Sequence, residues 1–391
     1  MAKRRGNNEG SISKRKNGTW QGYVTIGFDP ETGKPKRKHF YGKTRKEIQE
    51  KINDVAAKVS GGNYREPSKL KVYEWFNIWI EEYQRSALRL TTWESYKMQI
   101  DKHILPAIGH LHLSQLQTYH LQALYNEKQK DGARLDGKPG PLSPRSVRYI
   151  HMICHACLEQ AKKEGRIMIN PAEAVKLPAD PKKEIQYLDT EEVKIFLSEA
   201  KKTKHFAAYF LVLNTGLRRG ELLGLLWKDI NLKDGSITVN QSLVRVKGGL
   251  KFQEPKTKLS NRTIGISKEV INELKFHWRR QEGEKESAAE AYHNNGLVFC
   301  NEIGQPLCPR GFTRHYERLL NRAGLEQITF HALRHTFATL CLQQGTDPRT
   351  IQETLGHHKV AFTLDVYSGV TAKMKQEATD KIGSLMASCL E

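Results

Sequence analysis

The sequence predicts a multidomain α+β protein with three successive parts. These are a small three-stranded sheet plus helix at the N-terminus, a helical domain, and a mostly helical domain with a small antiparallel sheet. A length of 391 residues is enough for two or three hydrophobic cores. Stretches with the composition of linkers, at residues 61–68 and 177–184, divide the chain. We therefore expect domains at residues 1–62, 68–178 and 184–391.

The N-terminal strands are predicted from turn residues and from alternating side chains. Asn17-Gly18 readily adopts the positive φ angles of a tight hairpin turn, so residues 11–16 and 19–28 should pair as strands. Residues 29–33, with the sequence DPETG, form a second turn, and a third strand should cover residues 36–41. The first domain should therefore contain a three-stranded antiparallel sheet.

A helix should follow this sheet and cover one of its faces. Thr44 is placed to cap the helix, and apolar residues then recur at helical spacing. This stripe consists of Ile48, Ile52, Val55 and Val59. Val24, Ile26 and Phe28 alternate along the second strand, and we expect all three to pack against the stripe.

The opposite face of the sheet should combine aromatic and basic side chains. A small sheet with one apolar and one basic face fits the major groove of DNA, which admits a β-ribbon as well as a helix. The alternative is a solvated cationic face. We favour DNA binding, because aromatic and basic residues are interleaved in a cationic chain. The expected contacts are Lys14, Arg15, Tyr23, Thr25, Arg37 and Lys38.

The second segment, about residues 70–176, should be entirely helical. Val72, Trp75, Phe76 and Trp79 have helical spacing, and Thr91 or Thr92 should cap the next helix. A further helix is expected over residues 113–128. Pro144 should open the last one, with Ser143 as its cap. DNA contacts are expected from Thr92, Lys97, Arg145 and Arg148.

The last helix of this segment contains two histidines and two cysteines that could act as metal ligands. They are His151, Cys154, His155 and Cys157. The same helix has an ordinary apolar stripe through Ile150, Cys154, Leu158 and Ala161. We interpret the cysteines as core residues, and we predict neither a metal site nor a cofactor.

The composition favours a polyanionic partner. There are 63 Lys and Arg residues against 43 Asp and Glu, a formal net charge of +20. A surplus of this size favours nucleic acid, although a ribosome-associated or merely basic protein would share it.

The six cysteines are scattered, and the N-terminus lacks the apolar core of a signal peptide. No apolar run approaches the ~20 residues of a membrane span. We expect a protein of the reducing cytoplasm, with free thiols and no membrane contact.

The third segment should begin with a helix capped by Thr190. Helices are then expected over residues 206–214 and 219–226, and strands over residues 237–246 and 262–266. Further helices should extend to the C-terminus. This order predicts a mostly helical domain with a small antiparallel sheet.

Four local patterns in this segment contain residues suited to acting on a phosphate. In TGLRRGELLGL, a glycine ends one helix, so Arg218 and Glu221 should share one side of the next. In PKT, Lys256 lies in or beside a hairpin turn. In HALRHTF, His331 and Arg334 share a helix face at i, i+3. The fourth pattern, LGH followed by LDVY, contains His357 and Tyr367. Each pattern alone is commonplace in solvated surfaces or cores, and only their combination is specific.

Taken together and in this order, the four patterns resemble those of the tyrosine recombinases, or phage-type integrases. The resemblance is strongest to the three-domain form of temperate phages and integrative conjugative elements, and it extends over nearly the whole chain. It implies an arm-site DNA-binding domain, a helical core-site DNA-binding domain and a catalytic domain. The implied function is site-specific recombination that integrates and excises a mobile element through a 3′-phosphotyrosyl intermediate.

The resemblance also implies a role for each motif residue. Arg218 and Arg334 would clamp the scissile phosphate, Glu221 would brace the site, Lys256 would protonate the leaving 5′-oxygen, and Tyr367 would be the nucleophile. These roles suit the chemistry, because the planar fork of arginine holds two phosphate oxygens and a phenol of pKa about 10 needs help losing its proton. Cationic side chains supply the positive charge, so no metal is required.

The two motif histidines, His331 and His357, would contact the phosphate and assist proton transfer. Two neighbours make the assignment ambiguous. His358 directly follows His357, and either imidazole could face the phosphate. Arg219 directly follows Arg218, although the TGLR register favours Arg218.

The residues beyond Tyr367 form an apolar stripe with no evident partner in their own domain. In the family, such a tail helix docks onto a neighbouring protomer, so we expect a homotetramer on synapsed DNA with core-type and arm-type sites. The alternative is a helix folded back in cis. DNA-bending and excision proteins are candidate accessory partners. The stripe consists of Val370, Met374, Ala378, Ile382 and Leu385.

Other functions fit the sequence less well. A type IB topoisomerase would use similar residues, but the two segments before the third domain and the HALRHTFAT motif favour a recombinase. A metal-dependent transposase would need a cluster of acidic ligands, and a serine recombinase would need an N-terminal nucleophile; the sequence suggests neither. A catalytically inactive DNA-binding regulator of the same fold is disfavoured, because every motif residue is present.

Overall fold

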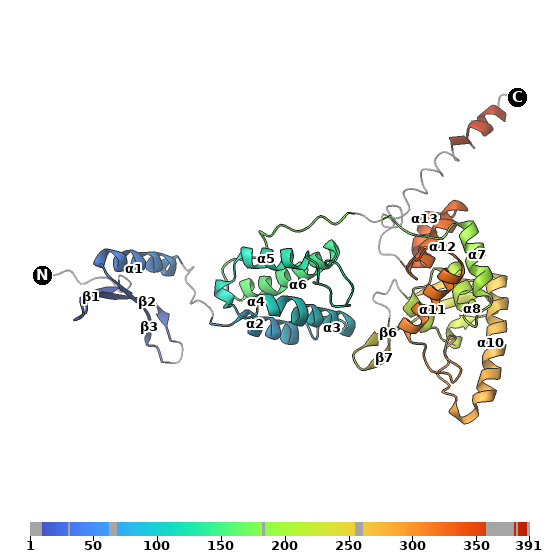
Figure 1. Ribbon diagram of the computed structural model, residues 1–391, viewed down its shortest axis with the longest axis horizontal. Coiled ribbons are helices and arrows are strands. Elements are labelled where there is room, and N and C mark those ends of the chain that lie inside the picture. The colour runs from blue at the N-terminus through green and yellow to red at the C-terminus, as the bar shows by residue number, and fades with distance from the viewer. Residues whose placement is uncertain are drawn as a thin grey trace. The chain divides into compact units, whose positions relative to one another are not determined.

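Figure 1 shows the computed structural model of the chain. It describes residues 10–29, 32–61, 69–181, 184–254, 261–356, 379–380 and 382–388. The chain forms two compact units, Met1–Asp180 and Pro181–Glu391. The first unit holds two separate hydrophobic cores, one beneath the N-terminal sheet and one among helices. The mixed helix and sheet architecture predicted from the sequence is confirmed.

The N-terminal part is a three-stranded antiparallel sheet with the order β1-β2-β3, covered by helix α1. Gly18 has a φ of 82° in the predicted hairpin turn. The hydroxyl of Thr44 accepts a hydrogen bond from the backbone N–H of Glu47, so the predicted cap is confirmed. Ile48 and Ile52 lie buried against Val24. The elements are β1 (Ser11–Lys14), β2 (Trp20–Phe28), β3 (Pro35–Gly42) and α1 (Arg45–Ser60).

The prediction that Phe28 packs against α1 is wrong. Phe28 is 69% exposed, whereas Val24 is fully buried. The pairing of β2 with β3 shifts between Thr25 and Gly27, which marks a β-bulge. A bulge inserts one extra residue, so it reverses the alternation of side chains beyond it.

Strand register also separates the basic residues that we expected on one face. Residues directly opposite one another in an antiparallel pair share a face. Arg37 pairs with Thr25, but Lys38 pairs with the buried Val24. Lys14 lies two residues after Ile12 and pairs with Trp20, so it shares the face of Ile12 and Val24. The expectation that Lys14 and Lys38 lie beside Tyr23 and Thr25 is therefore wrong.

The second part of this unit is helical, as predicted. Its core contains Trp75, Phe76 and Trp79, and Ser143 caps α6 by accepting from the backbone N–H of Ser146. The elements are α2 (Val72–Ile78), η1 (Trp79–Tyr83), α3 (Leu90–Gln99), η2 (Ile100–Ile104), α4 (Leu105–Ile108), η3 (Leu113–Gln115), α5 (Thr118–Lys128) and α6 (Pro144–Lys163).

Two helix starts in this part differ from the prediction. Helix α3 begins at Leu90 after Arg89, so neither Thr91 nor Thr92 is its cap. The region predicted as one helix over residues 113–128 is a short 3-10 turn followed by α5. Cys154 and Cys157 are fully buried, which confirms that they are core residues.

In its described residues, the second unit is mostly helical with two small antiparallel sheets, β4-β5-β8 and β6-β7. Its helices are α7 (Thr190–Ala200), α8 (Phe206–Thr215), α9 (Arg219–Leu223), η4 (Trp227–Asp229), α10 (Lys268–Ala288), η6 (Ala289–Ala291), α11 (Pro309–Arg322), α12 (Ala332–Gln343) and α13 (Pro348–Leu355). Its strands are β4 (Ile230–Asn231), β5 (Ser236–Val239), β6 (Ser242–Val246), β7 (Gly249–Gln253) and β8 (Arg262–Gly265).

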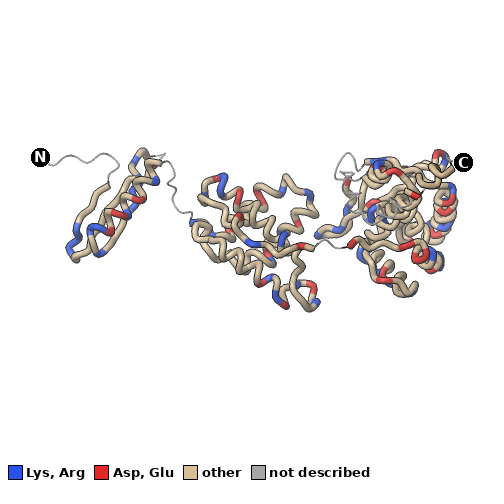
Figure 2. Tube along the Cα trace, turned by 90° about the horizontal axis from the view of Figure 1, so that it is seen from above, with Lys and Arg blue, Asp and Glu red and all other residues tan. Residues whose placement is uncertain are grey.

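Two local predictions for this unit are corrected. Asp189, not Thr190, caps α7, because its carboxylate accepts from the backbone N–H of Glu192. The strand predicted over residues 237–246 is divided into β5 and β6, which belong to different sheets. Lys and Arg positions occur throughout both units and are interspersed with acidic ones (Figure 2). Within the described ranges, no helix combines the length and apolarity needed to cross a bilayer.

Candidate active site

The turn between α8 and α9 places two motif residues side by side. Helix α8 ends at Gly216, whose φ of 63° lies in the left-handed region. A Cβ at this position would approach side-chain atoms of Leu355 and Phe337 to 2.4 and 2.7 Å, so glycine avoids both this crowding and the strain of a positive φ. Arg218 then caps α9, and Glu221 lies in its first turn, as predicted.

Glu221 is a buried carboxylate that two arginines contact. Its residue is 6% exposed. It accepts from Arg218 through the backbone N–H at 3.0 Å and through Nη1 at 2.7 Å. Arg262 donates both of its Nη groups to the same carboxylate, at 3.2 and 2.9 Å. Four hydrogen bonds therefore fix the carboxylate, and through it the guanidinium of Arg218.

Arg334 is buried beneath the site, with 1% of its residue exposed. Its Nη1 donates to the carbonyl of Gly216 at 2.8 Å, and its Nη2 donates to the carbonyl of Leu355 at 2.6 Å. One side chain thus joins three motif segments, namely the turn before α9, the helix α12, and the end of α13.

His331 lies at the N-cap of α12 and is partly exposed to solvent. Burial of the remaining ring surface and the positive charges of Arg334 and Arg218 lower the pKa of His331. The ring of His335 packs at 4.8 Å from it in an edge-on contact. Burial, together with the nearby His331 and the charge of Arg334, lowers the pKa of His335 to about 4. Both imidazoles are therefore neutral at pH 7, and His331 can accept a proton.

A groove of about 680 Å³ opens beside His331. Strand β6 and helix α11 form its walls, and Arg219 and Arg245 contribute positive charge. Arg219 donates to the hydroxyl of Thr313 in this wall, so it does not contact Glu221. The site thus combines cations, a neutral imidazole and an open groove.

Comparisons with known proteins match this arrangement of motifs. A family model described as the phage integrase family matches residues 186–374, and one for the phage integrase N-terminal SAM-like domain matches residues 71–129. A tyrosine recombinase XerC-like protein of Caldanaerobacter subterraneus is 31% identical over 93% of this chain and 95% of its own length. The chain belongs to the phage integrase family of tyrosine recombinases.

Solved structures of other family members share the fold. The Tn1549 transposon integrase in complex with a circular intermediate DNA matches with a TM-score of 0.66 and 21% identity, covering 78% of this chain and 99% of that one. A lambda integrase tetramer bound to a Holliday junction matches with a TM-score of 0.55 and 20% identity, covering 92% and 96%. The family, the fold and the enzyme class of DNA cleavage and rejoining predicted from the sequence are confirmed.

The described structure of this tyrosine recombinase contains only part of the predicted site. It brings together Arg218, Glu221, His331 and Arg334. Lys256, His357, His358 and Tyr367 lie outside the described residues, so their predicted roles stay predictions. Arg218, not Arg219, contacts Glu221.

Sequence reasoning missed two residues of this site, Arg262 and His335. His335 lies in the HALRHTF motif but was given no role. Arg262 opens a strand six residues after Lys256, and nothing in its local pattern reveals a partner 41 residues away. A basic residue at the first, inward-facing position of a predicted core strand was the one available signal.

The predicted DNA-contact residues of the first unit are in different environments. Arg15 and Arg37 lie over the rings of Tyr41 and Tyr23, at 5.3 and 4.7 Å. In the helical part, Thr92 is half-buried, while Lys97 forms an ion pair with Asp101 at 2.8 Å. Arg145 and Arg148 are exposed at the start of α6.

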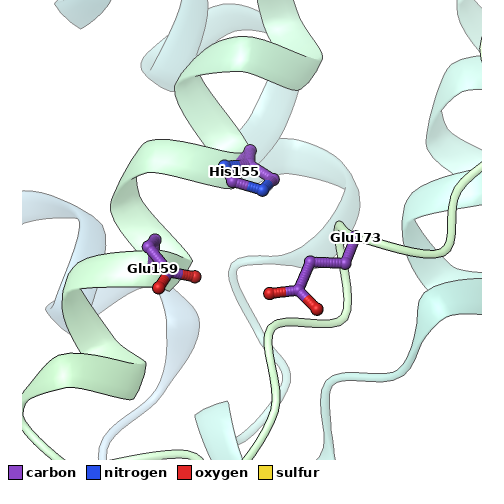
Figure 3. A group of neighbouring side chains, drawn as sticks. All are labelled: His155, Glu159 and Glu173. Atoms are coloured by element: carbon purple, nitrogen blue, oxygen red, sulfur yellow. The ribbon is translucent and has the colours of Figure 1, made fainter.

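One group of side chains in the described residues has the spacing of metal ligands. His155, Glu159 and Glu173 place one ligand atom each within 4.8 Å of one another (Figure 3). The ammonium of Lys162 lies 2.8 Å from Glu173 and 3.8 Å from Glu159. Because this cation already pairs with both carboxylates, we assign no metal to the group.

Glu221 should make stability depend on pH. Burial would raise its pKa, but hydrogen bonding and charge from Arg262, with the charge of Arg218, lower it from 4.5 to about 2. A lowered pKa stabilises the folded state above pH 4.5, and this contribution is lost as the pH falls toward 2. Glu221→Gln should reduce the free energy of unfolding at pH 7 by about 3 kcal/mol. Urea denaturation at several pH values measures the difference in the free energy of unfolding between the wild-type protein and Glu221→Gln. This difference should decrease as the pH falls from 4.5 to 2.

Glu191→Gln is the matched control for this prediction. Glu191 pairs with Lys194 in the same unit, but both side chains are mostly exposed, so the loss should stay below about 0.5 kcal/mol. Equal losses in the two variants would contradict a special role of the buried carboxylate.

Proposed function

We propose that this tyrosine recombinase uses Tyr367 to cleave and rejoin DNA at the ends of a mobile element. The phenolic oxygen attacks the scissile phosphorus, and the bond to the 5′-oxygen breaks as the phosphotyrosyl bond forms. The phenol transfers its proton to a motif histidine, and Lys256 gives a proton to the leaving 5′-oxygen. A free 5′-hydroxyl of the second site then reverses the reaction and joins the new strand.

The geometry of Arg218 is the observation that carries this proposal. Glu221 holds one edge of its guanidinium, yet the side chain is still 38% exposed. The N–H groups that do not contact Glu221 can stabilise the charge that gathers on the phosphate oxygens during attack. His331 lies beside it at the groove and can move a proton.

Arg334 has the second phosphate-clamp role in the proposal. Both of its Nη groups donate to backbone carbonyls in the described arrangement. Since only 1% of the residue is exposed, a phosphate contact requires that DNA binding open access to this guanidinium. The neighbouring histidine of the LGH motif, His357 or His358, would contribute the remaining proton transfer.

The same proposal includes double-stranded DNA as substrate, with core-type and arm-type sites, and a homotetramer on synapsed DNA. Ile382 and Leu385 of the tail stripe are 60% and 58% exposed, which suits docking onto a second copy. The lambda integrase relative was solved as a tetramer on a Holliday junction. DNA-bending and excision proteins are proposed accessory partners.

Covalent trapping on a nicked suicide substrate tests the proposal. Protein, EDTA and the end sequence of its own element would be incubated together and separated on a denaturing gel. A slowly migrating protein–DNA band is expected. Bound DNA without such a band would favour the inactive DNA-binding regulator instead.

The exposed face of the N-terminal sheet should contribute electrostatically to arm-site binding. Arg37→Ala should weaken binding and reduce the slope of log affinity against log salt by about 1, because one phosphate contact is lost. Fluorescence anisotropy of the full chain on labelled element ends at several salt concentrations measures this slope.

Lys38→Ala is the matched control, since Lys38 is adjacent, equally charged and on the opposite face. It should leave the slope unchanged. A smaller slope in Lys38→Ala than in Arg37→Ala would show that the sheet presents its other face to DNA.

A further inference from the structure

Arg262 is a buried arginine that joins separate segments of the candidate active site. It begins β8, and 6% of its side chain is exposed. Its two Nη groups hold Glu221, and its Nε donates to the carbonyl of Thr354 at 2.6 Å. The guanidinium is turned inward, so it cannot meet DNA in this arrangement.

The bond to Thr354 is one of three similar bonds. Arg262, Arg334 and Arg218 donate to the carbonyls of three consecutive residues, Thr354, Leu355 and Gly356. These carbonyls belong to the C-terminal end of α13, where backbone acceptors have no partner within the helix and the helix dipole is negative. The three arginines come from β8, α12 and the start of α9. They therefore fix the chain just before the LGH histidine.

Arg262 also limits how Arg218 can contact Glu221. A carboxylate and an arginine prefer a bidentate pair with two parallel bonds. Because Arg262 donates to both oxygens of Glu221, the side chain of Arg218 donates to it through Nη1 alone. Without Arg262, Arg218 could turn its whole fork onto Glu221, and fewer N–H groups would then face a phosphate.

We propose that Arg262 is a positioning residue for DNA cleavage, which holds Glu221 so that Arg218 presents its guanidinium to the scissile phosphate. The proposal rests on the role assigned to Arg218 in the proposed function. Arg262 itself contacts neither DNA nor the reacting atoms. Its loss should lower the cleavage rate at saturating DNA and leave DNA affinity nearly unchanged.

The test compares cleavage of two suicide substrates by the full-length protein. One has an ordinary scissile phosphate, and the other has a methylphosphonate, in which a neutral methyl group replaces one non-bridging oxygen. Arg262→Met should slow cleavage of the ordinary substrate by about 10- to 100-fold, the effect of a misplaced catalytic group. The methylphosphonate needs less cationic stabilisation. On this substrate, Arg262→Met and Arg218→Ala should therefore both cause a smaller loss of cleavage rate than on the ordinary phosphate.

Two further variants separate positioning from general destabilisation. Arg262→Lys keeps the charge but cannot contact both carboxylate oxygens and the carbonyl, so it should recover only part of the rate. It also replaces Arg262→Met if that variant fails to fold. Gln281→Ala removes another buried polar side chain of this unit, which accepts from Trp227 and donates to Leu297. Any loss it causes should be equal on both substrates.

The outcomes distinguish this inference from the proposed function. Equal losses of Arg262 variants on the two substrates, as in Gln281→Ala, would overturn the positioning role while leaving Arg218 in place. Full activity of Arg218→Ala on the ordinary phosphate would overturn the proposed function, and the positioning role with it. If Arg262→Met and Arg218→Ala both slow cleavage only of the charged substrate, the result supports the positioning role and the proposed function.

Discussion

Tyr367→Phe should abolish the covalent protein–DNA complex. The phenolic oxygen is the atom proposed to form the bond to phosphorus, and phenylalanine lacks only that atom. Loss of a nucleophile removes the covalent route altogether, so trapping should fall by more than about 10⁴-fold, to background. The measurement is the covalent band on nicked suicide substrates after incubation with EDTA.

DNA binding and folding should survive this substitution. Gel shifts of the intact complex should match those of the wild-type protein, because the change removes one hydroxyl. Tyr292→Phe serves as a control, since its hydroxyl contacts the sulfur of Cys300 at 3.7 Å and not the candidate site. A covalent band that persists in Tyr367→Phe would assign the nucleophile to another residue.

Arg218→Ala should reduce the rate of cleavage by about 10²–10³-fold, as expected when one donor to a charged transition state is removed. Among the described residues, it would leave Arg262 as the one cationic partner of Glu221. Single-turnover cleavage at saturating DNA is the appropriate measurement, because it separates the chemical step from binding. Arg218→Lys should restore little activity, since an ammonium cannot reproduce the planar fork.

Arg219→Ala is a closely matched control, one residue further along α9. Arg219 is exposed and donates to Thr313 in the wall of the groove. It should change DNA affinity more than the cleavage rate, because it has no contact with Glu221. If Arg219→Ala had the larger effect on cleavage, the two arginines would have to exchange roles.

Short-range patterns predicted the secondary structure around the site well. Gly216 marks the end of α8 as expected, and Glu221 lies in the first turn of α9, next to Arg218 at its N-cap. These features depend on residues within one or two turns of each other, which a sequence displays directly. Family membership followed from the order of four such patterns and is confirmed by the comparisons.

Long-range partners could not be predicted in this way. The contacts of Arg262 with Glu221 and Thr354 join residues 41 and 92 positions apart, and two of the acceptors of Arg334 are backbone carbonyls that have no sequence signature. The bulge before Phe28 arises in the same way, from pairing with another strand. The position of Lys38 could have been predicted from the sequence, because successive side chains along a strand alternate and Lys38 must therefore lie on the other face of the sheet from Arg37.

The arginine bonds to the end of α13 connect the backbone after this helix to two guanidinium groups, of Arg218 and Arg334, that are proposed to contact the DNA phosphate. Coupling free energies are reciprocal. If a phosphate contact changes the strength of the bond from Arg334 to Leu355, then a contact that fixes the chain after residue 356 changes the affinity of Arg334 for phosphate by the same factor. In the proposed reaction, DNA binding and the placement of the segment that leads to Tyr367 are therefore thermodynamically coupled.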